Sequence, residues 1–150
     1  MEVISRLAVP ADRPALRALR ARAAEEAAAL RGGPLLLRQL AGQTEAGGED
    51  LQAVVEIDQV PVGYLEARLV PVPGGAVLCR IDSLYVEPEA REVGAGESLV
   101  ALAGAWAREK DAVGIDAAVL PGAREAKNFF EGEGFVGRLI VMHRSLGSSR

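Results

Sequence analysis

Three apolar runs between residues 51 and 86 constrain the fold of this chain most strongly. The runs at 51–58 and 62–70 predict two strands joined by a tight turn at residues 59–61. A turn rich in proline and glycine follows, and the run at 76–86 predicts a third strand whose apolar content suits a central position in a sheet. The sequence therefore predicts a three-strand meander.

The segments around this meander alternate between strand and helix patterns. Before it we expect a strand at 2–9, a helix from Asp12 to about Arg31, a short helix at 35–40 and a mobile loop at 42–50. After it we expect a helix at about 96–110, a buried strand at 114–120, a helix that carries Ala126, Phe129 and Phe130, and a closing strand at 135–146. This order, without an internal repeat or linker, predicts a single domain over residues 1–150 with a mixed α/β fold.

Composition narrows the class of partner and compartment. The chain has 150 residues and a formal net charge of −4, with no lysine-rich or arginine-rich tract, which argues against nucleic acid as a partner. Cys79 is the only cysteine, so an internal disulfide is excluded and a reducing compartment is the simple expectation. The first residues lack the basic start and apolar run of a signal peptide, and no run is long enough to span a bilayer. We therefore expect a cytoplasmic protein.

Residues 84–99 form the segment most indicative of a binding site. A predicted strand ends at Val86, a proline-containing turn follows, and Gly94-Ala95-Gly96 opens a helix. Glycines at a helix start allow close approach of a ligand, and the free N–H groups there favour an anion such as a pyrophosphate. A Gly-x-Gly pair alone is more often a simple turn, and the sequence matches neither the P-loop nor the dinucleotide-binding fingerprint.

Two segments give this stretch a family context. Arg91-Glu92-Val93-Gly94-Ala95-Gly96 resembles the Gln/Arg-x-x-Gly-x-Gly/Ala signature of the GNAT acetyltransferases, and LYVEPEAR before it looks like the strand end and proline turn of that family. AREAKNFFEGEGF at 123–135 is similar to the family's later helix, which reads Asn-x-x-Ala-x-x-x-Tyr-Glu-x-x-Gly-Phe. The element order agrees from residue 2 to 146.

The resemblance implies a mostly antiparallel central sheet flanked by helices, with acetyl-CoA in a wedge between the strands at 76–86 and 114–120. It implies that the pantetheine amides meet backbone groups of Leu84, Tyr85 and Val86. It also implies that Arg91 belongs to the cofactor-binding residues and that the pyrophosphate meets main-chain N–H groups of the residues that follow, namely Glu92, Val93, Gly94, Ala95, Gly96 and Glu97. The hydroxyl of Ser98 is a further donor. The activity so implied is acetyl transfer to a primary amine by direct attack.

The sequence departs from the family pattern at several positions. Ala123 stands where the family has asparagine, and Phe130 stands where it has a tyrosine that protonates the leaving thiolate. Phenylalanine cannot donate a proton, so catalysis would depend on positioning, another acid or solvent. Glu92 and Glu97 add negative charge where the family often has basic or small residues. These departures keep open an alternative, a non-catalytic acyl-CoA-binding module that acts as a sensor or in a complex.

Candidates for the catalytic base are few. Asp82, near the end of its strand, is the first choice, and Glu66 on the neighbouring strand is the second; either could instead be a solvated surface charge. Tyr85 could replace the missing tyrosine, but a packed aromatic is the simpler interpretation. His143 is interpreted as a surface or packing residue. No cluster has the spacing of metal ligands, so no metal is expected. A homodimer is compatible with the sequence, and the acceptor amine is not identified by it.

Overall fold

The computed structural model describes residues 1–42 and 49–147. In these ranges the helices and strands are β1 (Val3–Leu7), α1 (Arg13–Ala28), α2 (Gly33–Ala41), β2 (Asp50–Ile57), β3 (Val60–Val72), β4 (Ala76–Val86), α3 (Ala95–Glu109), β5 (Ile115–Ala117) and α4 (Arg124–Gly132). Short 3-10 turns at Pro10–Asp12 and Pro88–Ala90 precede α1 and α3. No helix among these residues combines the length and apolar character needed to cross a bilayer.

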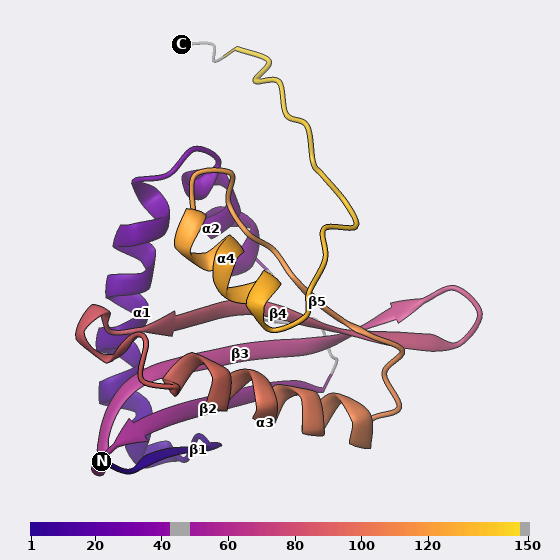
Figure 1. Ribbon diagram of the computed structural model, residues 1–150. Coiled ribbons are helices and arrows are strands. Elements are labelled where there is room, and N and C mark those ends of the chain that lie inside the picture. The colour runs from indigo at the N-terminus through magenta and orange to yellow at the C-terminus, as the bar shows by residue number, and fades with distance from the viewer. Residues whose placement is uncertain (43–48, 148–150) are drawn as a thin grey trace.

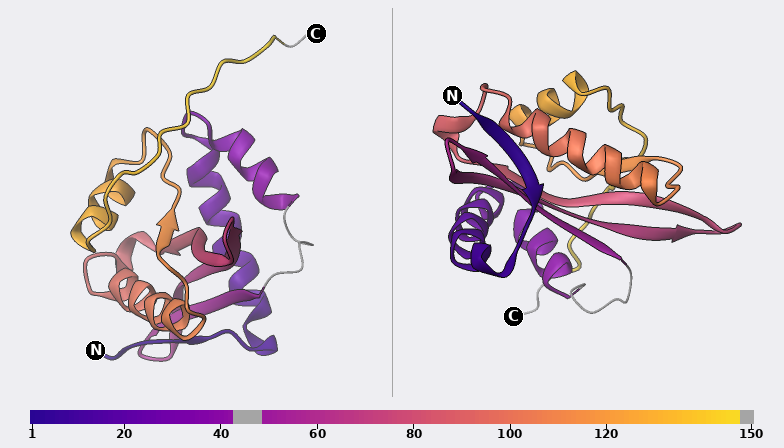
Figure 2. Two further views of the ribbon diagram at one scale, coloured as in Figure 1. Left: turned by 90° about the vertical axis from the view of Figure 1, so that its right-hand side faces the viewer. Right: turned by 90° about the horizontal axis from the view of Figure 1, so that it is seen from below.

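The strands form one sheet in the order β1-β2-β3-β4-β5. Neighbours are antiparallel except β4 and β5, which are parallel. Helices α1 and α2 cover one face of the sheet, and α3 and α4 cover the other (Figures 1 and 2). The predicted meander and the predicted mixed, mostly antiparallel sheet flanked by helices are therefore confirmed.

Each face of the sheet has its own apolar core. On the α1 face, Leu16 and Leu19 pack against Val54, Tyr64 and Tyr85. On the α3 face, the larger cluster joins alternate residues of the central strands to the inner side of α3, including Leu51, Val55, Leu65, Cys79, Ile81, Leu99 and Ala103. Because successive side chains of a strand point to opposite faces, the central strands supply both clusters at once.

A β-bulge interrupts β4 at Asp82. Glu66 of β3 lies opposite Ser83, whereas the next residue, Ala67, lies opposite Ile81, so Asp82 is the extra residue. Pairing of β4 with β5 ends at the same level, at Ile81 and Ala117. Beyond this point β4 continues to Val86, and β3 is the only strand beside it among the described residues. A bulge bends the strand that carries it, which explains why the parallel pair separates here.

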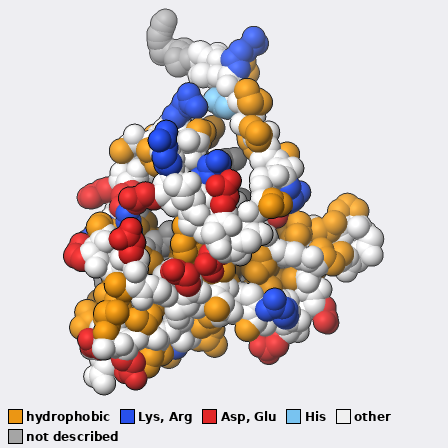
Figure 3. All heavy atoms as spheres, viewed as in Figure 1, with side chains coloured by type: hydrophobic (Ala, Val, Ile, Leu, Met, Phe, Trp, Pro, Cys, Tyr) orange, Lys and Arg blue, Asp and Glu red, His pale blue; other side chains and the backbone are white. Residues whose placement is uncertain are grey.

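Two expected elements differ in the structure. The strand expected at 114–120 is confined to Ile115–Ala117, because it can pair only with the part of β4 that precedes the bulge. The strand expected at 135–146 is wrong: this segment has no secondary structure, and after Arg138, which pairs with Asp116, it runs away from the body of the protein (Figure 1). Figure 3 shows hydrophobic side chains along this C-terminal extension, and they are exposed. The composition is typical of a strand, but a strand also needs a neighbour to pair with.

Smaller differences concern the segments before β2. Helix α1 ends at Ala28 rather than near Arg31, and α2 spans Gly33–Ala41. Of the loop expected to be mobile, residues 43–48 lie outside the described residues.

Candidate functional site

The loop between β4 and α3 is fixed at its start by the neighbouring strand. The Glu87 N–H donates to the Val62 carbonyl at 2.8 Å, which continues the contact with β3 past the end of β4. Glu92 and Gly94 then adopt left-handed backbone conformations, with φ of 71° and 91°. Glycine adopts this conformation without a steric penalty, which explains Gly94 at the residue before α3.

The first turn of α3 presents backbone N–H groups outward. The first hydrogen bond of the helix runs from the Ser98 N–H to the Gly94 carbonyl at 3.0 Å. The N–H groups of residues 95–97 therefore have no hydrogen-bond acceptor within the helix. A Cβ placed on Gly94 would have no heavy atom within 4 Å, so the space beside this turn is open. Open space next to unpaired donors at a helix N-terminus suits an anionic group.

The second glycine of this loop has a different surrounding. A Cβ on Gly96 would lie 3.0 Å from Cε1 of Phe129, so the ring of Phe129 on α4 packs against the backbone of α3 here. The Ser98 hydroxyl is 2.6 Å from the Ser5 hydroxyl on β1. Glu92 and Glu97 are exposed. Gly96 thus allows α3 and α4 to pack closely, whether or not a ligand is bound. The Ser98 hydroxyl is already hydrogen-bonded to Ser5 of β1.

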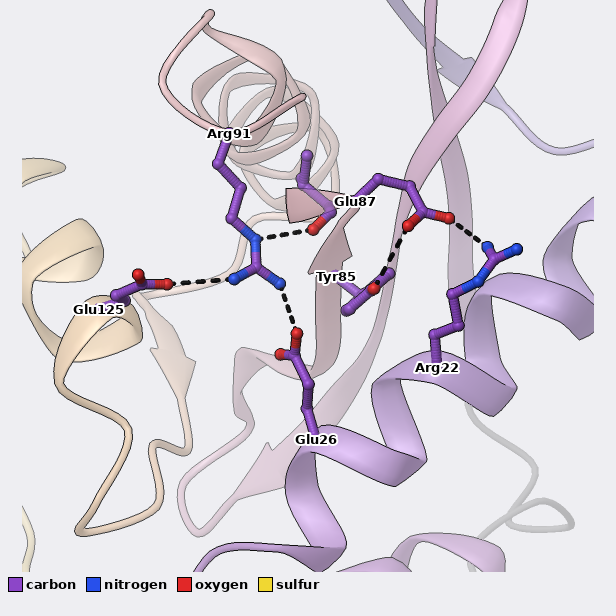
Figure 4. Close-up of polar contacts among 7 residues, drawn as sticks. Arg22, Glu26, Tyr85, Glu87, Arg91 and Glu125 are labelled. Atoms are coloured by element: carbon purple, nitrogen blue, oxygen red, sulfur yellow. Dashed lines mark hydrogen bonds and ion pairs between the residues drawn. The ribbon is translucent and has the colours of Figure 1, made fainter. Parts of the chain in front are cut away.

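Arg91 links three elements around the loop (Figure 4). Its Nε donates to the Val86 carbonyl at 2.8 Å, its Nη2 is 2.7 Å from a carboxylate oxygen of Glu26 on α1, and its Nη1 is 3.1 Å from one of Glu125 on α4. The guanidinium also lies 5.6 Å from the ring centroid of Tyr85. The Arg91 side chain therefore joins β4, α1 and α4.

Tyr85 and Glu87 form a second group beside Arg91. The Tyr85 hydroxyl is 3.5 Å from a carboxylate oxygen of Glu87, whose other oxygen pairs with Arg22 of α1 (Figure 4). Burial raises the pKa of the Tyr85 phenol, and the Glu87 carboxylate acts in the same direction. The phenol is therefore protonated at neutral pH and able to donate a hydrogen bond.

Both predicted catalytic carboxylates are engaged by arginines. The two oxygens of Asp82 accept from Nε of Arg68 at 3.0 Å and from Nε of Arg80 at 2.7 Å. Glu66 pairs with Arg20 of α1 and accepts from the Gln52 side-chain amide at 3.1 Å. Asp82 is at the bulge and Glu66 opposite Ser83, so the two carboxylates occupy neighbouring strands at the level where β4 and β5 part. Each carboxylate is therefore paired with at least one arginine.

The remaining predicted site residues are placed as follows. Leu84 packs against the larger core, and Val86 is buried with its carbonyl accepting from Arg91. Val93 is exposed and Ala95 is buried under the start of α3.

Cys79 is fully buried, and burial raises the pKa of its thiol to about 11. Among the residues that the structure describes, no three His, Cys, Asp or Glu side chains are grouped as metal ligands.

Phe130, at the position of the family tyrosine, is part of the packing. It is 8% exposed and its ring makes edge contacts with Phe129 and Phe135, at centroid distances of 5.2 and 5.1 Å. Sequence reasoning missed the partners of Arg91 and Glu87, namely Glu26, Arg22 and Glu125. Glu26 is separated from Arg91 by 65 positions, and nothing in one sequence links a glutamate on a predicted helix to a distant arginine.

Comparisons with known proteins agree on one family. The model of the Acetyltransferase (GNAT) family matches residues 16–135. A search of curated proteins found no match.

Solved structures with the same fold cover nearly all of this chain. A structure of AAC(6')-Iy in complex with the bisubstrate analogue CoA-S-monomethyl-acetylneamine has a TM-score of 0.73 at 17% identity, covering 97% of this chain and 99% of that chain. The ribosomal-protein-alanine N-acetyltransferase from Brucella melitensis biovar Abortus 2308 has a TM-score of 0.74 at 16% identity, with 97% and 100% covered. A transcriptional regulator from Bacillus halodurans C-125 has a TM-score of 0.67 at 20% identity, with 95% and 100% covered. At these identities the likeness concerns the fold.

Proposed function

This chain belongs to the acetyltransferase (GNAT) family, and from that premise we propose that it transfers an acetyl group from acetyl-CoA to a primary amine. The observation that carries the proposal is the separation of β4 from β5 at the Asp82 bulge, next to a helix whose first turn offers free N–H groups. Separated strands expose backbone edges, and a helix N-terminus attracts an anion. Together these features suit a long ligand with an amide chain and a pyrophosphate.

In this proposal the donor is held mainly by the backbone. The pyrophosphate would meet N–H groups of residues 92–97, where the position beside Gly94 is open. The pantetheine would lie along Leu84, Tyr85 and Val86, on the side of β4 that faces β5 up to Ile81 and, within residues 1–42 and 49–147, no strand afterwards. The Val86 carbonyl already accepts from Arg91 and is a weaker candidate for this contact. Glu92 and Glu97 oppose anion binding, so we expect a modest affinity for acetyl-CoA.

The chemistry requires two proton transfers. The amine nitrogen attacks the thioester carbonyl, a C–N bond forms, the C–S bond breaks, and the amine loses a proton. Asp82 is the proposed acceptor of that proton, since it lies where the strands part; Glu66 is the second candidate. Phe130 has no proton to give, so we propose that the departing thiolate is protonated by solvent. No covalent enzyme intermediate is needed.

The test is release of free CoA thiol from acetyl-CoA with a panel of amines, amino acids, aminoglycosides and peptides. Two of the structurally similar proteins, AAC(6')-Iy and the Brucella protein, are an aminoglycoside N-acetyltransferase and a ribosomal-protein-alanine N-acetyltransferase, which motivates including both acceptor classes. We expect turnover with at least one amine and none with the corresponding alcohol. Acetyl-CoA binding by calorimetry without thiol release for any acceptor would reject the enzyme proposal.

That outcome would favour the second candidate, a non-catalytic acyl-CoA-binding module. Two observations support it: Phe130 is buried in ring packing, and both candidate bases are held in ion pairs. The backbone features of the proposed donor site are independent of these side chains. The two candidates therefore share acetyl-CoA binding and differ only in turnover.

A further inference from the structure

One side of the first half of α1 is lined with arginines. Arg13, Arg17 and Arg20 follow one another at spacings of four and three residues, so their side chains lie on the same side of the helix. Together with Leu16 and Gln52 of β2, they line a cavity of about 320 Å³. Among the described residues, no aspartate or glutamate lines this cavity, although the chain has a net charge of −4. We call it the arginine pocket.

The three arginines of the pocket differ in how they are held. Arg20 pairs with Glu66 of β3, and its guanidinium lies 5.9 Å from the ring centroid of Tyr64, so it is fixed against the sheet and its charge is balanced. Arg13 and Arg17 are exposed, and in the part of the chain that the structure describes neither has an ion-pair partner. The arginine pocket therefore carries two positive charges that no described carboxylate balances.

The stability of α1 does not account for these two charges. Arginines four positions apart on a helix repel each other, and a cation near the first residue of a helix opposes the helix dipole. Arg13 is the first residue of α1, and residues 13–16, its first turn, include no acidic residue. An anion bound in the arginine pocket would relieve both effects. It would also accept hydrogen bonds from the guanidinium groups, whose planar shape suits a carboxylate or a phosphate.

The arginine pocket adjoins the residues that we propose for the acceptor site. Gln52 donates to Glu66 at 3.1 Å, and Glu66 lies opposite Ser83, the residue after Asp82. The Ser83 hydroxyl bonds that of Tyr64, which packs against α1, so the row from Gln52 to Ser83 lies on the α1 face. Neighbouring strands lie about 4.8 Å apart, so about 10 Å separates the pocket from the point where β4 leaves β5. A molecule of that length would reach both places.

We propose that the arginine pocket binds the anionic end of the acceptor, which is therefore an amine with a carboxylate or phosphate about 10 Å from its nitrogen. This inference rests on the proposed acetyl transfer and names the class of molecule that receives the acetyl group. An α-amino acid is too short, because two bonds of about 1.5 Å join its nitrogen to its carboxyl carbon. Three extended residues span about 10 Å, so the amine and the free carboxylate of a tripeptide match this separation.

The first experiment measures binding without turnover. Triglycine titrated into the nitrogen-labelled full chain should shift the NMR signals of the Nε–H groups of Arg13 and Arg17. Triglycine amide keeps the amine and lacks the anion, so it should bind about tenfold more weakly. Arg13→Gln with Arg17→Gln should weaken triglycine binding by a similar factor.

The control variant is Arg108→Gln with Arg124→Gln. It removes the same total charge from exposed positions of α3 and α4, on the other face of the sheet, and should bind triglycine as the wild type does. Equal binding of triglycine and its amide, or unchanged triglycine binding in the variant of Arg13 and Arg17, would overturn the proposal.

The second experiment compares kcat/KM for acetyl transfer to matched acceptors at saturating acetyl-CoA. Triglycine should exceed triglycine amide by about tenfold in the wild type, and the variant of Arg13 and Arg17 should bring the two within about twofold. Aminohexyl phosphate, compared with aminohexanol, separates the two anions. A larger gain from the phosphate than from the carboxylate identifies an acceptor that carries a phosphate, and the reverse identifies one that carries a carboxylate.

The two experiments keep this inference distinct from the proposed activity. If no amine is acetylated but triglycine binds through Arg13 and Arg17, acetyl transfer is rejected and the anion-binding pocket is supported. If amines are acetylated with no preference for those that carry an anion, or with a preference that the variant of Arg13 and Arg17 retains, acetyl transfer is supported and this inference is overturned.

Discussion

Strand β4 has two halves that differ in their surroundings. From Ala76 to Ile81 it lies between β3 and, from Cys79 onward, β5, and Cys79 and Ile81 are buried in the larger core. From Ser83 to Val86 it pairs with β3 and, in the part of the chain that the structure describes, with no other strand. Tyr85 and Val86 of this half are also buried, each in one of the two apolar clusters. Charged side chains lie beside them, and these form the ion pairs Arg22–Glu87 and Arg91–Glu26.

The residue between the halves explains the difference. Asp82 is one extra residue in β4, and the parallel pairing with β5 ends next to it. A bulge changes the direction of a strand without ending it, so β4 can stay attached to β3 while it leaves β5. The comparison indicates that the first half holds the sheet together and that the second half borders the proposed acetyl-CoA site. Substitutions can test that division, and the largest effect is expected at the loop that follows the second half.

Gly94→Val should nearly abolish acetyl-CoA binding. The new side chain would occupy the open space beside the first turn of α3, and we expect affinity to fall about 100-fold, or about 2.8 kcal/mol. Calorimetric titration measures this loss. The same substitution also strains the backbone, because φ at Gly94 is 91° and valine disfavours that region.

Gly74→Val is the matched control for that strain. Gly74 has φ of 98°, and a Cβ there would also meet no heavy atom within 4 Å, but it lies in the turn between β3 and β4, before the first half of β4. Both variants should lose about 1–3 kcal/mol of unfolding free energy, while only Gly94→Val loses affinity. Equal affinities in the two variants would contradict the proposed pyrophosphate site.

Asp82→Asn should lower turnover by about 100-fold, the usual scale of general-base catalysis, with acetyl-CoA affinity within about threefold of wild type. The amide keeps the shape of the side chain but accepts no proton. Steady-state kinetics at saturating acetyl-CoA provides the measurement, and Glu66→Gln is assayed beside it. A large loss in Glu66→Gln alone would move the base to β3 and remove Asp82 from the mechanism.

Asp12→Asn controls for the loss of an arginine–carboxylate pair. Asp12 is buried and accepts from both Nη atoms of Arg6, outside the proposed site, and that pairing lowers the pKa of its carboxyl group. A carboxyl group whose pKa is lower in the folded than in the unfolded protein adds stability at pH values above the unfolded-state pKa. This added stability is lost as the pH falls through the folded-state pKa. Asp12→Asn should therefore lose less stability as the pH is lowered from 7 toward and below the ordinary pKa of an aspartate, with turnover of the folded protein unchanged.

Arg91→Met should lower both stability and affinity by moderate amounts. The variant loses the bonds to Val86 and Glu26 and the exposed contact with Glu125, and we expect about 1–2 kcal/mol of unfolding free energy to be lost. Acetyl-CoA affinity should fall by less than in Gly94→Val, because Arg91 positions the loop without entering the open space. Urea unfolding measures the stability and calorimetry measures the affinity. Arg124→Met is the control, because Arg124 is an exposed residue of α4. An unchanged stability would mean that the Arg91 contacts do not fix the loop.

Part of this arrangement was predictable from the sequence. Turn residues and apolar runs predicted the meander, and the glycines at 94 and 96 predicted the helix start, because both signals are local. The bulge was not predicted, since Asp82 is an ordinary residue for a strand end and the shift exists only relative to β3. The contacts of Arg91 depend on a helix 65 positions away. The closing strand at 135–146 was wrong for a single chain, because strand-type composition does not supply a partner.

The smallest effects are expected for the two tyrosines on the α1 face, at Tyr85 in the second half of β4 and at Tyr64 on β3. The Tyr64 hydroxyl lies 2.8 Å from the Ser83 hydroxyl, so Tyr64→Phe should lose about 1 kcal/mol of unfolding free energy. The Tyr85 hydroxyl is 3.5 Å from its only described partner, Glu87, so Tyr85→Phe should lose less, about 0.5 kcal/mol.

Turnover of these two variants decides whether Tyr85 replaces the family's proton donor. Burial raises the pKa of both phenols, that of Tyr64 to about 12, so both keep their protons between pH 6 and about pH 9 and neither can cause a pH dependence of turnover there. If solvent protonates the thiolate, as proposed, Tyr85→Phe changes kcat by no more than about twofold, like Tyr64→Phe. A kcat at least about tenfold lower in Tyr85→Phe, with Tyr64→Phe unaffected, would instead assign proton donation to Tyr85, since general acids contribute on that scale or above.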